Sequence, residues 1–589
     1  MKKAITWKVL ATLFAVLTTT LFSFVSCSDD DDVKKEPEPP EPEPGEVISW
    51  DSPIKSEKEA LALAAGAYYD WGRLSSSFSF LLESATESTI SFEGDDSADG
   101  PLVSRFETDK NNWYPTKIFN YLYVSIGEAN KAVAKLDSAY ATGSLTQATI
   151  DLAKGRAKFI RGLAYLYLVQ LWGEVPVFTS PSPANAERTA RKSIDEVYTQ
   201  IVTDLTEAEE LLPDFDINRS NPSKGSANAI LARAYLQWAG KPLTQAETGA
   251  IAGGKTDPAA PQWDNARLQK VVEHADRVIN SGNFQLEANF ESLWGVQSEN
   301  RSAEHIFTIH HDGDGNGDSQ GNHQTHCPFT FGFDLYTDNH IGPADVTLLD
   351  WFEAGDKRKR LSITAQLYNA NEKTGSATPD VPENYRKYEF TFPVTSPRYA
   401  KWIHRYNRAA LIEVAPDQGV NYAGQPNNIN RVEIRLADVL LHKAEAKFYL
   451  NSGDRGLAEI NQIRERAGLS RLTALTQNDL ENEYKLEQFF EQRNWVNLVR
   501  WRKLIQTVLK VSNYEYFKED YRDVSSIVAR FGPEEEGATY PASTNYPFFA
   551  KIYTHLHKKY DNVNGKFYRF PIPGGLSGND LGIAQNPGY

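Results

Sequence analysis

Apolar residues recur every three or four positions through much of the chain, which is the pattern of amphipathic helices. Ser56 begins the first such stretch and forms a capping box with Glu59, so a helix is expected to start there. Pro115 opens another stretch, and Gly173 stands where a third one stops. The pattern predicts helices over about 56–74, from 115, over 146–172, from 193, 224 and 264, and over 433–450, 456–467 and 478–503.

Four of the predicted helices start near positions 116, 150, 193 and 224, about 30–45 residues apart. This spacing is typical of helix hairpins stacked as in tetratricopeptide repeats, although the signature residues of that repeat are not cleanly present. Between about 290 and 432, Gly, Asn, Asp and aromatic residues stand without a sustained helical pattern. We therefore predict a mainly α protein, with a helical scaffold over about 56–285 and 433–505 and a loop-rich, irregular region over about 290–432.

The N-terminus has the layout of a secretory signal, with basic residues first, an apolar middle and a small residue before the cut. Three lysines lie among the first eight residues, and residues 9–25 are almost free of charge. A membrane-spanning helix is the alternative, but no basic flank follows the apolar run. Cys27 stands where a lipoprotein signal places its lipid-bearing cysteine. We predict a signal peptide over 1–26 and lipidation of Cys27.

Two unusual segments follow the cysteine. Residues 29–32 are four aspartates, and residues 36–44 consist only of Glu and Pro. An acidic run is usually a solvated charge block, but directly behind a lipidated cysteine it resembles the signal that sends lipoproteins of the Bacteroides group to the outer face of the outer membrane. The Glu/Pro segment predicts a stiff spacer of about 3 Å per residue. We place this linker at 27–48 and a single folded body at 49–589.

The charge of the chain narrows the choice of partner. Removal of residues 1–26 takes away three lysines and no acidic residue, so the formal net charge changes from −16 to −19. A chain this acidic repels phosphate backbones, and it has no basic stripe, so we expect no nucleic-acid partner. Its two cysteines are Cys27 and Cys327, so lipidation of the first leaves no intrachain disulfide.

Five parts of the mature chain have a recognisable sequence, namely 157–177, 223–236, 435–446, 460–469 and 570–573 with 585–589. They resemble the SusD/RagB family of outer-membrane nutrient-binding proteins, in the expected order over nearly all of the mature chain. One stretch departs from the family pattern. Before Arg500-Trp501 the family usually has Glu-Gly and Asp-Leu, whereas this chain has Glu491-Gln492 and Asn497-Leu498, which affects a local helix contact.

The resemblance implies a SusD-like body with tetratricopeptide-like helix pairs and a partnership with a SusC-like TonB-dependent β-barrel in the outer membrane. Most characterised relatives bind glycans, and the RagB branch is linked to peptide uptake. We therefore expect a non-catalytic lipoprotein on the extracellular face, which binds oligosaccharides and delivers them to such a transporter. Capture of peptides or glycopeptides on the same fold is one alternative, and a surface enzyme or adhesin is another.

Other chemistry is weakly supported by the sequence. Residues 249–256 fit the phosphate-binding pattern G-x-x-x-x-G-K-[ST], but a helix is predicted before them and Asp257-Pro258 follows at once, so the required strand and helix are missing. No H-E-x-x-H motif occurs. A pair of carboxylates at glycosidase separation cannot be recognised in a sequence. We therefore expect no catalytic residues and no cofactor.

The sequence suggests a candidate metal site in the segment 312–318. Asp312, Asp314, Asn316 and Asp318 alternate with glycines and resemble the first half of a calcium loop. His323 stands where the bidentate Glu of such a loop belongs, and neither flank reads as a helix. Two interpretations remain, a flexible acidic loop and a calcium site. The four histidines nearby are too loosely spaced to demand zinc.

Sugar recognition needs flat apolar faces for the C–H sides of rings and planar polar groups for hydroxyl pairs. Aromatic residues on loops are better candidates than those in helical stripes. Trp113 and Tyr422 lead, because both stand in polar surroundings. Each candidate could instead pack its own loop. The further candidates are the aromatic residues Phe92, Tyr114, Phe329, Phe331 and Tyr336, the polar residues Asp70, Asp95, Asp96 and Arg398, and Cys327 as part of a wall.

Overall fold

The computed structural model shows which of the predicted helices form and how they pack. Its described part is mainly helical, which confirms the predicted fold class. The structure describes residues 53–68, 71–92, 99–293, 302–309, 340–343, 351–358, 367–368, 387–388, 431–489, 491–512, 555, 557–575 and 582–589.

Helices of the N-terminal half pack mainly against their neighbours in sequence, as the predicted helix pairs require. The pairs α4 and α5, α5 and α7, α7 and α8, and α8 and α10 lie side by side. These helices are α1 (Glu57–Gly66), α2 (Trp71–Leu82), α3 (Asp99–Ser104), α4 (Trp113–Thr142), α5 (Gln147–Trp172), α6 (Asn185–Thr189), α7 (Ile194–Leu211), α8 (Lys224–Ala239), α9 (Gln245–Ile251) and α10 (Asn265–Asn280).

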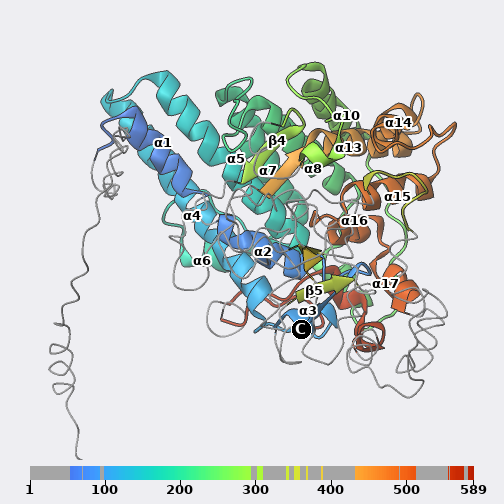
Figure 1. The fold of residues 1–589 in the computed structure, drawn as a ribbon. Coiled ribbons are helices and arrows are strands. Elements are labelled where there is room, and N and C mark those ends of the chain that lie inside the picture. Colours follow the sequence, from blue (N-terminus) through green and yellow to red (C-terminus); the bar gives the residue numbers. More distant parts are fainter. Residues whose placement is uncertain are drawn as a thin grey trace, which may run out of the picture. The chain divides into compact units, whose positions relative to one another are not determined.

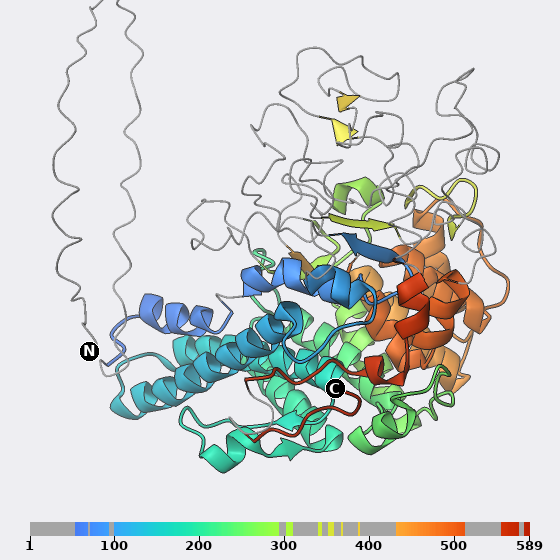
Figure 2. The same ribbon diagram turned by 90° about the horizontal axis from the view of Figure 1, so that it is seen from below.

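A second group of helices follows the loop-rich region. In both views it gathers on the side of the scaffold opposite α1 and the start of α5 (Figures 1 and 2). Its helix α13 joins the two groups by packing on α10 and α8. The members are α13 (Leu436–Leu450), α14 (Leu457–Arg466), α15 (Gln477–Glu487), α16 (Asn494–Trp501) and α17 (Leu504–Ser512), and short 3₁₀ turns occur at Phe290–Leu293 and Gly565–Tyr568.

Helix α5 forms the centre of the scaffold. Thr146 caps its start by accepting a hydrogen bond from the backbone N–H of Thr149, and Gly173 ends it, both as predicted. Every residue of 159–172 is buried, so other parts of the protein cover this part of the helix on all sides. The C-terminal segment lies against its end, where the indole of Trp172 donates to the carbonyl of Pro571 at 2.8 Å.

Short strands pair segments that are distant in sequence. Strand β4 (His305–Ile309) is buried at every position and pairs antiparallel with β8 (Arg431–Arg435). Strand β1 (Thr89–Phe92) pairs with β5 (His340–Pro343). The remaining pairs are β2 (Val175–Pro176) with β3 (Arg191–Lys192) and β6 (Leu367–Tyr368) with β7 (Lys387–Tyr388). The predicted loop-rich region thus contributes at least one fully buried strand to the scaffold.

Three predicted helix boundaries are wrong. The helix expected over 56–74 ends at Gly66, and α2 begins separately at Trp71. Residues 433–435 belong to β8 and not to the helix after it. The long helix expected over 478–503 is two helices, separated near Gln492, whose φ of 62° is left-handed and cannot continue a right-handed helix.

Buried ion pairs join the loop-rich region to the second helix group. Arg435, at the end of β8, donates to Glu304 at 2.7 Å and to Glu487 at 2.6 Å. Arg358 donates to the other carboxylate oxygen of Glu487 at 3.0 Å. These four side chains are fully buried. Arg435 also donates to Glu491, so the glutamate that this chain shares with the family pattern before Arg500-Trp501 contacts this network.

A second buried cluster surrounds Glu433 of β8. Its carboxylate accepts hydrogen bonds from Arg233 at 2.6 Å and Arg493 at 3.1 Å. Arg431 lies 3.2 Å away, and the hydroxyl of Tyr167 donates at 2.9 Å. Burial by itself raises the pKa of the Glu433 carboxyl, but the three guanidinium groups outweigh it and lower that pKa to about 2. The carboxylate therefore stays charged.

Candidate binding surface along α4

Most of the residues predicted to bind ligand, lipid or metal lie outside the described residues, and the predictions about them stay predictions. Phe92 is the last residue of β1 and pairs with His340. Trp113 and Tyr114 lie in the first turn of α4, two residues earlier than the helix start expected at Pro115. The residues outside the described ranges are Cys27, Asp70, Asp95, Asp96, Asp312, Asp314, Asn316, Asp318, Cys327, Phe329, Phe331, Tyr336, Arg398 and Tyr422.

Trp113 presents its indole to solvent at the N-terminal end of α4, with 47% of the side chain exposed. Tyr114 is buried and packs edge-on against it, with ring centroids 5.1 Å apart. Lys117, one turn further along the helix, holds its ammonium 4.4 Å from the indole centroid. The indole is therefore held in place by its neighbours while half of its surface remains available for contact.

The backbone around Trp113 is fixed by hydrogen bonds from two directions. The N–H of Trp113 donates to the carboxylate of Asp99 at 3.1 Å, and the side-chain amide of Asn112 donates to the carbonyl of Asp99 at 3.0 Å. From the C-terminal segment, the N–H of Gly574 donates to the carbonyl of Lys110 at 2.7 Å. Helix α3 and residues near 574 thus hold the first turn of α4 in one position.

A cleft of ≈ 440 Å³ lies further along the same helix. Its walls come from three segments that are far apart in sequence, namely α4, the loop from Phe178 into α6, and the C-terminal segment at Ile583. The volume lies within the range of small-molecule binding sites, about 300–1,000 Å³. The lining residues are Phe119, Asn120, Tyr123, Val124, Gly127, Phe178, Ser180, Pro181, Pro183, Arg188 and Ile583.

The aromatic wall of the cleft is rigid. The rings of Tyr123 and Phe178 stack with centroids 5.7 Å apart. The hydroxyl of Tyr123 donates to the carbonyl of Pro176 at 2.8 Å. The hydroxyl of Tyr165 accepts from the N–H of Phe178 and donates to its carbonyl, both at 2.9 Å. The cleft is therefore formed before any ligand arrives, which lowers the ordering cost of binding.

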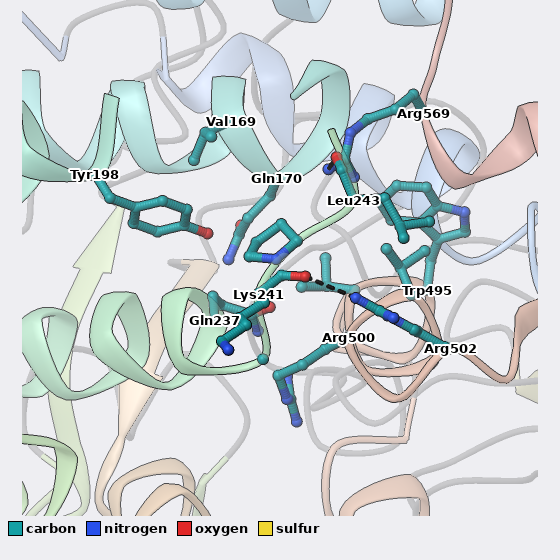
Figure 3. Close-up of a pocket in the computed structure, with 14 residues that line it drawn as sticks. Val169, Gln170, Tyr198, Gln237, Lys241, Leu243, Trp495, Arg500, Arg502 and Arg569 are labelled. Atoms are coloured by element: carbon teal, nitrogen blue, oxygen red, sulfur yellow. Dashed lines mark hydrogen bonds between the residues drawn. The ribbon is translucent and has the colours of Figure 1, made fainter. Parts of the chain in front are cut away.

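A much smaller cavity of ≈ 20 Å³ lies where the last turns of α5, α8 and α16 meet (Figure 3). Its charged lining residues are all basic, and Arg502 donates to the carbonyl of Lys241 at 2.9 Å. Burial lowers the pKa of Arg569, which binds the carbonyl of Leu243. The space holds about one water molecule and no sugar ring, so the cleft beside α4 is the better candidate for a ligand.

The sequence predicts Trp113 as a binding residue, and the structure exposes its indole, but no prediction covered the cleft. One signal was present, because Val124 is apolar and 47% exposed. It is out of phase with the buried positions Ile118, Leu122 and Ile126 of the same helix. No sequence pattern could bring Phe178 and Ile583 to this helix, since tertiary packing alone places them there.

The described ranges also bear on a membrane-spanning helix and on a metal site. There, every helix is too short or too polar to cross a lipid bilayer. Among the same residues, no three His, Cys, Asp or Glu side chains are grouped in a way that could hold a metal ion. The Asp312 to Asp318 segment lies outside the described residues, and its calcium site stays a prediction.

Comparisons with known proteins agree with the resemblance. The model described as "SusD family" matches residues 290–589, and the one described as "Starch-binding associating with outer membrane" matches residues 83–236. A SusD-like protein of Formosa agariphila is 26% identical over 524 residues, which cover 83% of this chain and 89% of the relative.

Solved structures show the same fold. A laminarin-binding SusD-like protein matches with a TM-score of 0.62 at 22% identity, over 91% of this chain and 100% of its own. A structure solved with a xylogluco-oligosaccharide matches with a TM-score of 0.57 at 18% identity, over 78% of this chain and 85% of its own.

Proposed function

The chain belongs to the SusD family, and on that premise we propose that it captures oligosaccharides at the cell surface and delivers them, uncleaved, to a TonB-dependent transporter in the outer membrane. Two structural neighbours, named for laminarin and for a xylogluco-oligosaccharide, support the choice of ligand class. The description "associating with outer membrane" supports the location. The predicted lipid on Cys27 supplies the anchor.

The observation that carries the proposal is the exposed indole of Trp113. An indole face beneath a sugar ring removes apolar area from water, at about 25 cal/mol per Å². Its position at the end of a long helix, fixed by Asp99 and Tyr114, means that little ordering is needed when a ligand binds. The indole thus offers a rigid stacking platform of the kind that carbohydrate recognition requires.

The test is a glycan array probed with soluble protein that lacks residues 1–44. We expect the protein to bind one class of oligosaccharide, and Trp113→Ala to weaken that binding by about 1–3 kcal/mol, or roughly tenfold to a hundredfold. Tyr140→Ala is the matched control, because Tyr140 is 60% exposed on the same helix but lies near its other end. Circular dichroism shows whether both variants remain folded.

Three results would overturn the proposal. Failure of the parent protein to bind any glycan, together with binding to a peptide library, would assign the chain to peptide capture. Recovery of a shortened sugar would make it an enzyme. Equal glycan binding by the parent and by Trp113→Ala would move the site away from α4, to the aromatic residues predicted at 329–336 and 422.

A further inference from the structure

The exposed residues of α4 form one continuous stripe from Trp113 to the cleft. Trp113, Lys117, Asn120, Val124 and Gly127 are spaced by four, three, four and three positions, which places them on one face of the helix. None of these five residues is buried. With a rise of about 1.5 Å per residue, the stripe is about 21 Å long.

Two polar side chains of the cleft make few contacts with the described part of the fold. Within the described part of the chain, the side-chain amide of Asn120 makes no hydrogen bond. Arg188, across the cleft, has no carboxylate within ion-pair distance there, and its Nε donates a hydrogen bond to the carbonyl of Pro183 at 3.3 Å. A planar amide and a planar guanidinium beside aromatic walls are groups that can bind adjacent hydroxyls of a sugar.

We propose that the cleft is a second subsite of the Trp113 surface, so that a single extended oligosaccharide lies along α4 from Trp113 to Gly127. This inference rests on the proposed function. Trp113 stacks on one ring, while the rigid wall of Tyr123 and Phe178 takes another. Asn120 and Arg188 then bind hydroxyl groups between and beside these rings. The protein recognises a length of chain and not only a chain end.

A protein partner is the competing occupant of an apolar cleft, but two features favour a glycan. The aromatic wall of the cleft is preformed, and its lining combines flat rings with a planar amide and a planar guanidinium, the mixture of groups that small-molecule sites use. It also continues, on the same helix face, the platform on which the proposed function rests. A specific protein interface uses about 20–30 residues on each side, more than the eleven that line the cleft.

Gly127 allows the cleft to be filled without disturbing the core. An ideal Cβ at this position meets no atom within 4 Å, so a bulky side chain here projects into open space. We expect Gly127→Trp to weaken the binding of long oligosaccharides about tenfold or more, while short members of the same series, which reach only Trp113, bind as before. Gly66→Trp is the control, because Gly66 is also helical, exposed and without atoms near an ideal Cβ.

The experiment uses an array that carries short and long members of several oligosaccharide series, with parent protein, Trp113→Ala, Gly127→Trp and Gly66→Trp. Asn120→Ala provides a second variant of the cleft if Gly127→Trp fails to fold, and it should also spare short ligands. Absence of binding by the parent would defeat the proposed function and this inference together. Glycan binding by the parent that is unchanged in both cleft variants would defeat the inference alone. If a cleft variant keeps its glycan binding but no longer co-purifies with the transporter, the cleft binds a protein partner and the inference fails.

Discussion

Glu433 shows how one buried carboxylate balances several arginines. It is the acidic group closest to Arg233, Arg431 and Arg493, all of which are buried. Removal of one partner from a buried ion pair leaves uncompensated charge in a medium of low dielectric constant, which costs more than the pair itself contributes. The stability of the centre of the scaffold therefore depends strongly on the charge of this residue.

We predict that Glu433→Gln lowers the free energy of unfolding by about 3–5 kcal/mol. Urea denaturation at neutral pH measures the change. Glu465→Gln is the matched control, because Glu465 pairs with Arg471 on the surface, where both side chains are about half exposed, and should cost less than about 1 kcal/mol. Similar losses in the two variants would contradict this account of the cluster.

The same residue predicts a dependence on pH. The pKa of Glu433 is lowered to about 2 in the folded protein, below the ordinary value of 4.5. The unfolded chain therefore binds this proton first as the pH falls, and the stabilisation, complete above about pH 4.5, is lost between there and about pH 2. Parent protein should lose stability over this interval, and Glu433→Gln should lose less. Parallel stability profiles for the two proteins would show that other groups dominate acid unfolding.

At the scale of elements, the approach of α14 to α13 depends on a glycine. Gly456 caps the start of α14 with a φ of 87°, a left-handed conformation that other residues rarely adopt. An ideal Cβ at this position would lie 2.6 Å from the Cα of Ala444 in α13. Because that neighbour is backbone, the whole helix would have to shift to make room.

We predict that Gly456→Ala destabilises the protein by more than Gly143→Ala does. Gly143 also has a left-handed backbone, with a φ of 64°, but no atom lies within 4 Å of an ideal Cβ there. The control should cost about 1–2 kcal/mol for conformation alone. Gly456→Ala should cost about 1–3 kcal/mol more, because it also overpacks the helix contact. Thermal unfolding of both variants measures the difference, and equal melting temperatures would refute the close-packing argument.

Sequence pattern located the helices better than it located their breaks. Local signals at Thr146 and Gly173 gave both ends of α5, since caps are formed by residues adjacent in sequence. The break near Gln492 has no such signal. Apolar residues continue with helical spacing on either side of it, but Glu487 and Glu491 must reach Arg435, and this contact comes from a segment about fifty residues away.

The candidate site shows the same contrast between local signals, which the sequence contains, and contacts between distant segments, which it does not. Trp113 was identified because an aromatic residue in polar surroundings indicates exposure. The cleft was not, because its walls come from three separate parts of the chain. Tyr114, adjacent to Trp113 and predicted with it, is buried. Neighbouring positions in a helix point in different directions, and only the packing of α3 and the C-terminal segment shows which of the two faces solvent.

At the scale of the whole molecule, attachment to the membrane is predicted to depend on Cys27. We expect Cys27→Ala to abolish acylation and to release or mislocalise the protein, because a lipid is the single attachment that the sequence suggests. Metabolic labelling with a fatty acid and membrane fractionation measure the two effects. Unchanged membrane retention in the variant would contradict the lipoprotein hypothesis.

The acidic run over 29–32 predicts a separate effect on exposure. Replacement of the four aspartates with alanine should leave the protein lipidated but lower the fraction at the outer surface. Digestion of whole cells with external protease measures that fraction, and the Cys27→Ala protein serves as the unlipidated reference. Complete digestion of the alanine variant, equal to that of the parent, would show that the acidic run does not direct the protein to the outer surface.

The carboxylate of Glu487 has a consequence for how this protein can evolve. It binds Arg358 through one oxygen and Arg435 through the other. Fully buried side chains therefore hold the described chain on either side of residues 359–430. Loop length adds little entropic cost, about 0.6 kcal/mol for each doubling. Residues 359–430 could therefore be exchanged between relatives as one cassette, and ligand preference could diversify while the helical body stays unchanged.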